Sequence, residues 1–293
     1  MKKKPRIMKR ILSIALASAL VATSVQITAI PSHVVLAAPG NITTGVPLGD
    51  TNVKDQNVLT FYKIIANAVA AKNSEVLDYI GSHTAQEVLN LYKEDDKLTS
   101  PAMGTDLIRY DGKIDFGNLK VSSMEGIGWA QNAREMDLSG ITLATGNDIT
   151  SIPDKEFQNC SGLQKIILPQ TVTTIGNNAF EGCKNLVTLG IGTVADGVVD
   201  LSKVNTIGSN AFSACETISD LELGKYDTRS ELTIKAQAFL GCTGLEKIEI
   251  PVKNAALIGA SAFENCSGLQ EIGLQKDLQY IGNAVFRGTG AST

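Results

Sequence analysis

Residues 175–191 read IGNNAFEGCKNLVTLGI, and this wording returns through the second half of the 293-residue chain. The shared pattern is Ile-x4-Phe-x2-Cys-x2-Leu-x2-Ile-x-Leu, in which Leu and Ile exchange. Four more copies are found at residues 152–168, 207–223, 234–250 and 258–274. All five cysteines of the chain occupy the same phase of this repeat. Self-similarity at a period of about 20–50 residues is the sequence signature of stacked repeats, so we expect a solenoid.

The two ends of the repeat predict two kinds of backbone. Leu-x2-Ile-x-Leu ends in an alternation with a period of two, which is typical of a short strand with one buried face. Ala-Phe-x2-Cys, with Gly or Asn nearby, favours a tight helical turn that returns the chain. Because one unit cannot bury its own apolar stripe, stacked units must share a core and a parallel ladder of strands. The predicted fold class is an α/β solenoid with a short parallel β-ladder on one face.

The repeat weakens toward both of its ends. A degenerate copy precedes the five clear ones in the same phase, with Ile127, Ala130, Ala133, Met136 and Leu138 at the core positions. A sixth copy opens at Ile281 and Phe286, and the sequence stops before its strand, so we expect an incomplete last repeat. The widest spacing between consecutive cysteines contains the insert Gly192–Asn205. We expect this insert to bulge as a loop or an extra hairpin.

These residues resemble a known family. The wording of residues 175–186 and 245–251 is similar to the BspA-type leucine-rich repeat of bacterial surface proteins, and it covers roughly residues 151–293. The segments Met124–Asn132 and Met136–Gly140 resemble the opening repeat of internalin-like leucine-rich proteins. The resemblance implies a leucine-rich-repeat solenoid displayed outside the cell that binds protein, often in adhesion. It names no ligand, because function depends on the site and not on the fold.

The first residues have the form of an export signal. Six basic side chains and no acidic one fall within residues 1–37. An apolar run from Ile11 to Val25 follows the basic residues, and it is shorter than the roughly 20 residues that span a bilayer. Val35-Leu36-Ala37 matches the small-residue pattern that precedes a signal-peptidase cut. We expect a signal peptide at 1–37 and a secreted or cell-surface protein, and a retained signal anchor is the alternative.

A helical region is predicted before the repeats. Val58, Tyr62, Ile65 and Val69 fall on one face of a helix. A second stripe runs from Leu77 through Tyr92, and Thr84 to Glu87 within it has the form of a capping box. We expect these helices to cover the exposed end of the first rung, and a separate partner-binding module is the alternative. The expected layout is a linker at 38–53, a helical N-terminal cap at 54–112 and leucine-rich repeats at 113–293.

The charge of the chain excludes some partners. The whole sequence carries 26 basic and 30 acidic side chains, a formal charge of −4. Without residues 1–37 it keeps 20 basic and all 30 acidic side chains, which gives −10. Nucleic acid requires Lys and Arg to neutralise its phosphates, and anionic lipid attracts basic segments. We therefore expect a protein ligand, such as a host-matrix or neighbouring-cell surface protein, with no nucleic acid and no membrane insertion after signal cleavage.

The strand positions between the core residues are the candidate binding surface. Alternation sends them outward, and eight of the twelve on the six predicted strands are charged, six of them acidic. The candidate protein-binding residues are Lys165, Ile167, Asp220, Glu222, Lys247 and Glu249. Such a face fits a basic patch of a protein better than a small ligand. A solvated sheet face with no partner is the competing interpretation.

Little in the sequence points to chemistry. The cysteines lie 23 or more residues apart, without the close pair that a metal cage needs, and their common phase predicts buried free thiols. No Gly-x-Ser-x-Gly, His-Glu-x2-His or phosphate-loop motif occurs. We therefore expect no enzyme, no catalytic residue, no metal and no cofactor. The alternative function is the recognition arm of a larger exported enzyme, such as a cell-wall hydrolase.

Overall fold

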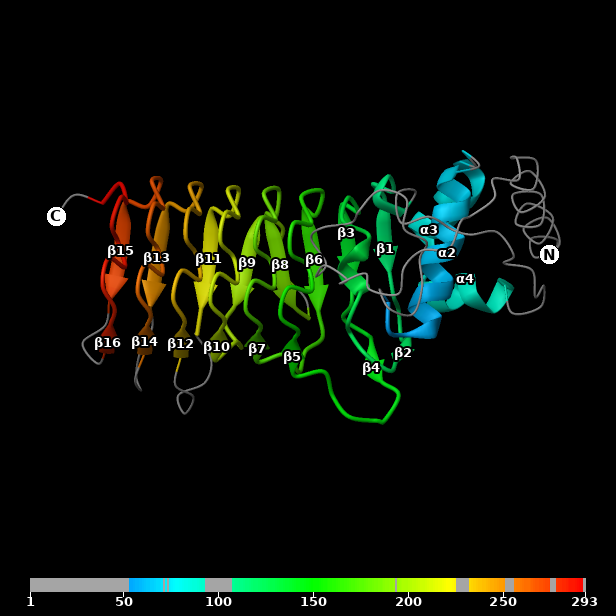
Figure 1. Ribbon diagram of the computed structural model, residues 1–293, viewed down its shortest axis with the longest axis horizontal. Helices are drawn as coiled ribbons and strands as arrows, with labels where there is room; N and C mark the ends of the chain where they lie inside the picture. Colours follow the sequence, from blue (N-terminus) through cyan, green and yellow to red (C-terminus); the bar gives the residue numbers. More distant parts are fainter. Residues whose placement is uncertain are drawn as a thin grey trace, which may run out of the picture.

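The computed structural model describes residues 53–92, 107–224, 232–250, 256–274 and 278–291, apart from Ala71, Asn73 and Thr193. Figure 1 shows a row of rungs with helices packed at the N-terminal end. Two parallel sheets run along the row, and each rung supplies a strand to one or both of them. This is the predicted solenoid with a parallel ladder.

The larger sheet has eight strands in the order β1-β3-β6-β8-β9-β11-β13-β15. They span Lys113–Asp115, Glu135–Asp137, Lys165–Leu168, Thr188–Ile191, Val198–Leu201, Asp220–Leu223, Lys247–Ile250 and Glu271–Leu274. The six-stranded sheet has the order β16-β14-β12-β10-β7-β5, with β5 at Ser151–Ile152, β7 at Thr174–Ile175, β10 at Thr206–Ile207, β12 at Leu232–Ile234, β14 at Ala256–Ile258 and β16 at Leu278–Ile281. A two-stranded pair joins β2 (Lys120–Val121) to β4 (Thr142–Leu143).

The repeated residues form the core between the two sheets. The phenylalanine rings stack from rung to rung, with centroids 5.1 Å apart between Phe157 and Phe180 and 5.2 Å apart between Phe212 and Phe239. The cysteines form a second column. Each of the four later thiols donates a hydrogen bond of 3.1 Å to the carbonyl oxygen of a phenylalanine on the preceding rung, as Cys215 does to Phe180. All five cysteines are free and buried, as their phase predicts.

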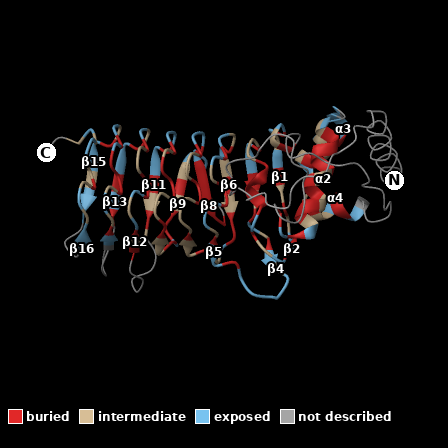
Figure 2. Ribbon diagram, in the orientation of Figure 1, coloured by how far each residue is buried: buried red, intermediate tan, exposed pale blue. Residues whose placement is uncertain are grey.

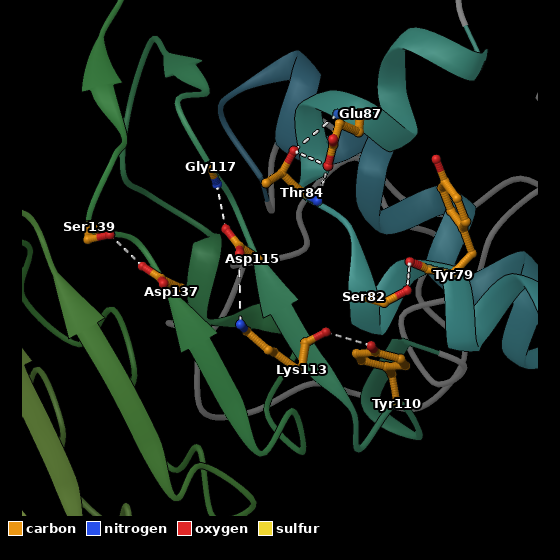
Figure 3. A network of polar contacts seen from close by, with 10 residues as sticks. All are labelled: Tyr79, Ser82, Thr84, Glu87, Tyr110, Lys113, Asp115, Gly117, Asp137 and Ser139. Atoms are coloured by element: carbon orange, nitrogen blue, oxygen red, sulfur yellow. Dashed lines mark hydrogen bonds and ion pairs between the residues drawn. The ribbon is translucent and has the colours of Figure 1, made fainter. Parts of the chain in front are cut away.

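The helical region contains α2 (Gln56–Ala70), α3 (Ser74–Ser82) and α4 (Ala85–Tyr92). Helix α2 buries Val58, Tyr62 and Ile65, the stripe that predicted it. The capping box is confirmed, because the backbone N–H of Glu87 donates to Thr84 Oγ1 while the N–H of Thr84 donates to the Glu87 carboxylate (Figure 3). Helix α3 packs against β1, the first strand of the eight-stranded sheet (Figure 1).

A buried carboxylate lies where the helices meet the repeats. Glu156 is 1% exposed and accepts hydrogen bonds from the backbone N–H groups of Gly128 at 2.9 Å and Gly126 at 3.3 Å, at the start of a 3₁₀ turn over Ile127–Trp129. The Tyr62 hydroxyl donates to the carbonyl oxygen of Ile127 in the same turn. Burial raises the pKa of Glu156 to about 8, and the backbone hydrogen bonds oppose that rise without cancelling it.

The insert Gly192–Asn205 corrects the prediction of a bulging loop or hairpin. It contributes β9, which pairs parallel with β11 over four residues and also with β8. The insert forms a strand because apolar and outward residues alternate in it. Val199 and Leu201 point into the core as the repeat residues do. The insert is an abbreviated rung that lengthens the ladder.

Two predictions lie outside the described residues, namely the signal peptide at 1–37 and all of the 38–53 linker except Val53. In the part of the chain that the structure describes, helices are too short or too polar to traverse a lipid bilayer.

Candidate functional site

The outer face of the eight-stranded sheet presents two rows of side chains. The first row takes the first residue of each strand, in the order Lys113, Glu135, Lys165, Thr188, Val198, Asp220, Lys247 and Glu271. The second row takes the third residue, in the order Asp115, Asp137, Ile167, Gly190, Asp200, Glu222, Glu249 and Gly273. The two rows differ in charge, because bases alternate with acids in the first, whereas the second holds five acids and none of its eight residues is basic.

The turns that follow the strands hold three acids of the second row in place. Asp115 Oδ1 accepts a hydrogen bond of 2.9 Å from the N–H of Gly117, and Asp137 Oδ1 accepts from the N–H and hydroxyl of Ser139 (Figure 3). Asp200 Oδ1 accepts from the N–H of Ser202 at 2.8 Å. An aspartate that caps the turn two residues later is a common local motif. It anchors each carboxylate through one oxygen, so these acids form a row with defined positions.

The bases of the first row are paired with acids. Lys247 Nζ lies 3.2 Å from carboxylate oxygens of both Glu249 and Glu271, and hydrogen bonds to these two carboxylates raise the pKa of Lys247. Lys165 Nζ lies 2.5 Å from Asp196 Oδ1, and this hydrogen bond is the main cause of the raised pKa of Lys165. Water and salt reach both pairs and screen them, so they contribute little to stability. The bases therefore offset neighbouring acids and leave the face negative.

Gly192 and residues 194–197, together named the strap here, cross the outer face of β8. The N–H of Gly197 donates to Thr188 Oγ1 at 2.8 Å, and a Cβ built on Gly190 would lie 2.2 Å from the Cβ of Val194. The strap therefore rests directly on β8. Thr188 and Gly190 are two of the twelve strand positions that the alternation predicts to lie on the open surface. That prediction is wrong for this pair, because both are buried and β8 is covered on its two faces (Figure 2).

The predicted binding residues fall into two groups on either side of the strap and β9. Lys165 and Ile167 lie in a first hollow of about 430 Å³, whose wall includes Gly192 and Val194 of the strap. The other four lie in a second hollow of about 470 Å³, formed by Asp220, Glu222, Lys247 and Glu249 together with Ser219 and Glu246. The structure therefore brings the six residues onto one face but into two separate places.

Sequence reasoning missed part of this face. It did not name Lys113, Asp115, Val198 or Asp200, because β1 and β9 lack the Phe and Cys of the repeat. A usable signal existed, since each of the two strands has an apolar residue between two outward positions and is followed by Gly or Ser two residues after its aspartate.

His83 is half-buried in the helical region and stacks on Tyr79 with ring centroids 3.7 Å apart. Its Nδ1 lies 3.1 Å from Ser82 Oγ and 3.1 Å from the carbonyl oxygen of Tyr79. Within the described residues, no set of three or more His, Cys, Asp or Glu side chains is grouped closely enough to hold a metal ion. The candidate site is the outer face of the eight-stranded sheet.

A parallel ladder of short strands, closed by tight turns around stacked phenylalanines and cysteines, defines a leucine-rich-repeat solenoid. The chain belongs to the family described as the BspA type leucine rich repeat region, whose sequence profile matches residues 134–225 and 198–293 with six copies. No curated protein matches the sequence.

Solved structures similar to this chain come from several bacteria. A leucine-rich repeat protein from Bacteroides ovatus is 28% identical over 53% of this chain and 37% of its own, with a TM-score of 0.43. A leucine rich cell surface protein from Faecalibacterium prausnitzii is 20% identical over 60% of this chain and 62% of its own, with a TM-score of 0.27. An internalin from Listeria monocytogenes is 15% identical over 81% of this chain and 78% of its own, with a TM-score of 0.30. The chain thus spans less than two thirds of the length of the Bacteroides ovatus protein and of the Faecalibacterium prausnitzii protein.

Proposed function

We propose that this protein is displayed or secreted and binds another protein through the outer face of its eight-stranded sheet. The observation that carries the proposal is the second row, in which five of the eight residues are carboxylates and none is a base. Neighbouring strands lie about 4.8 Å apart, so eight strands extend the row over roughly 34 Å. A row of this length can contact a broad patch on another protein. Specific interfaces need such a patch, because they bury about 800 Å² on each partner.

The sign of the row indicates the chemistry of the partner. Aligned carboxylates repel one another, and a basic surface that approaches them relieves this repulsion and is attracted to the face. Leucine-rich-repeat proteins of this type are in general associated with the cell surface and bind proteins. A host-matrix or neighbouring-cell surface protein with a basic patch is therefore the proposed partner, with adhesion or recognition as the role.

Charge reversal on the face tests this function. Asp220→Lys with Glu222→Lys should weaken binding to an immobilised extract of extracellular-matrix proteins at least tenfold, because two attractive contacts become repulsive. The matched control is Glu125→Lys with Asp148→Lys, which makes the same change in net charge at two exposed positions outside the eight-stranded sheet. Equal loss in the two double variants would show that net charge alone governs binding and would rule out the face.

Export is part of the same proposal. It divides the chain into a signal peptide at 1–37, a linker at 38–53, a cap at 54–112 that covers the first rung, and repeats at 113–293. Its support is the basic start, the apolar run and the small residues before Ala37. N-terminal sequencing of protein recovered from a secreting bacterial host should begin near Ala38. An intact Met1 would show that the segment is retained as an anchor.

A further inference from the structure

The strap separates two hollows of different chemistry. The first hollow holds two bases and two acids around apolar Ile167 and Val194, with Lys113, Glu135, Asp137 and Lys165 as the charged residues. Among the described residues that line it, the second hollow has four acids and one base, namely Asp220, Glu222, Glu246, Glu249 and Lys247. That one base already contacts Glu249 and Glu271, so the second hollow is acidic. A partner must therefore meet two different environments along one face.

The strap is built to stay in this position. Gly192 and Gly197 begin and end it with φ of +87° and +85°, a backbone region that side chains other than glycine rarely adopt. Three contacts fasten the part between them, namely Val194 on Gly190, the Gly197 N–H on Thr188 and Asp196 on Lys165. They come from β8 and its neighbour β6, so the strap is fixed over one place on the ladder. This makes the wall between the hollows a stable feature of the surface.

From these contacts we infer that the strap divides the face into two subsites, which together bind one extended segment of the partner through an apolar side chain and a basic side chain. The apolar side chain enters the first hollow against Ile167 and Val194. The basic side chain enters the second hollow among Asp220, Glu222 and Glu249. The inference rests on the proposed function and adds the form of the segment that the face recognises.

The geometry of the ladder sets the spacing between the two side chains. Strand β6 carries Ile167, and β11 and β13 carry Asp220, Glu222 and Glu249 of the second hollow. In the order of the sheet, β11 is three strands from β6 and β13 is four strands from it. At about 4.8 Å per strand, the subsites lie roughly 14–19 Å apart. An extended chain advances about 3.3 Å per residue, so the basic residue should stand about four to six positions from the apolar one.

Selection from a random 12-residue peptide library displayed on phage, panned against the full chain, tests this inference. Enriched peptides should carry a large apolar residue and a Lys or Arg separated by four to six positions. Panning against Val194→Asp should reduce the apolar enrichment about tenfold and leave the basic residue enriched. Panning against Glu222→Lys with Glu249→Lys should have the opposite effect. Val187→Asp is the matched control, because Val187 is 38% exposed just before β8 and outside both hollows.

The possible results separate the two proposals. Basic peptides without a fixed spacing, or a Val194→Asp selection identical to that of the unchanged protein, would overturn the two-subsite arrangement and leave binding through the face intact. Absence of any enrichment would also overturn the two-subsite arrangement. Loss of matrix binding that is the same for the face variant and its charge control would instead defeat the proposed function, whatever the peptides show.

Discussion

The inside of the solenoid and its outer face are built from the same strands, yet they obey different rules. Inside, each rung repeats the previous one, and the rings of Phe212 and Phe239 lie within 3° of parallel. Outside, neighbouring rungs carry different residues, such as Ile167 on β6, Asp200 on β9 and Glu222 on β11. The repeated positions maintain the fold because stacking demands identical shapes, whereas the outward positions vary without disturbing the ladder. The outward positions can therefore change from rung to rung while the core stays the same.

The largest effect is expected inside. Phe212 is fully buried between Phe180 and Phe239, and Phe212→Ala should lower the free energy of unfolding by about 3–5 kcal/mol. Phe286 occupies the same position in the last rung, is half-buried and stacks on Phe263 alone among the described rings, at 5.8 Å. Phe286→Ala should therefore cost less than half as much. Urea unfolding followed by circular dichroism measures both, and equal losses would contradict a core stabilised by stacking between neighbours.

Glu156, the carboxylate buried where the helices meet the repeats, should make the stability depend on pH. Burial raises the pKa of Glu156 to about 8, so the folded protein keeps a proton that the unfolded chain releases near pH 4.3. Stability should therefore fall as the pH rises from about 4 to 8, because over this range the folded state binds more protons than the unfolded state. Glu156→Gln should remove this decline and raise the melting temperature at pH 8.

Glu264 provides the matched control for that measurement. It is nearly buried in the same way, but hydrogen bonds from Ser261 and Arg287 lower its pKa. Because folding lowers this pKa, the ionised carboxylate stabilises the folded protein at pH values above the pKa of the unfolded chain. This stabilisation is lost as the pH falls and the carboxylate takes up a proton. Glu264→Gln should therefore reduce the loss of stability at acid pH. It should leave unchanged the decline of stability toward pH 8. A Glu156→Gln variant with the pH profile of the unchanged protein would show that the buried carboxylate does not titrate in this range.

The same contrast explains how much could be predicted from the sequence. The phase of phenylalanine and cysteine predicted the ladder and the buried thiols, because a stacked core permits one arrangement. The alternation predicted the outward strand residues except on β8, where the strap covers Thr188 and Gly190. Neither pattern predicted the strap, because Val194 and Asp196 lie in an insert that has no counterpart in the other rungs. Tertiary contacts with β6 and β8 decide its path, and these were not visible in the local pattern.

The junction at Glu156 shows a signal that was present and went unused. The residue before the repeated phenylalanine is alanine in four copies, at Ala179, Ala211, Ala238 and Ala262, and glutamate in the first. The alanines are buried against neighbouring rungs, whereas Glu156 meets the free N–H groups of a 3₁₀ turn. A polar residue at a position that is alanine in the other copies therefore marks the rung that packs against the 3₁₀ turn and not against another repeat of the same kind. The pKa of the group could not be derived without the burial that the fold imposes.

The smallest effect is expected on the face, at the pair of Lys165 and Asp196. Asp196 is 83% exposed, so water and salt screen the pair, and Asp196→Asn should change the free energy of unfolding by less than about 1 kcal/mol. The strap is held as well by Val194 on Gly190 and by the N–H of Gly197, which donates to Thr188. Hydrogen exchange at the Gly197 amide should therefore quicken only slightly in Asp196→Asn and clearly more in Val194→Ala, which removes most of the contact with β8. Faster exchange in Asp196→Asn than in Val194→Ala would assign the position of the strap to charge and not to packing. In that case 0.5 M NaCl should release the strap of the unchanged protein, and the two hollows would merge at high salt.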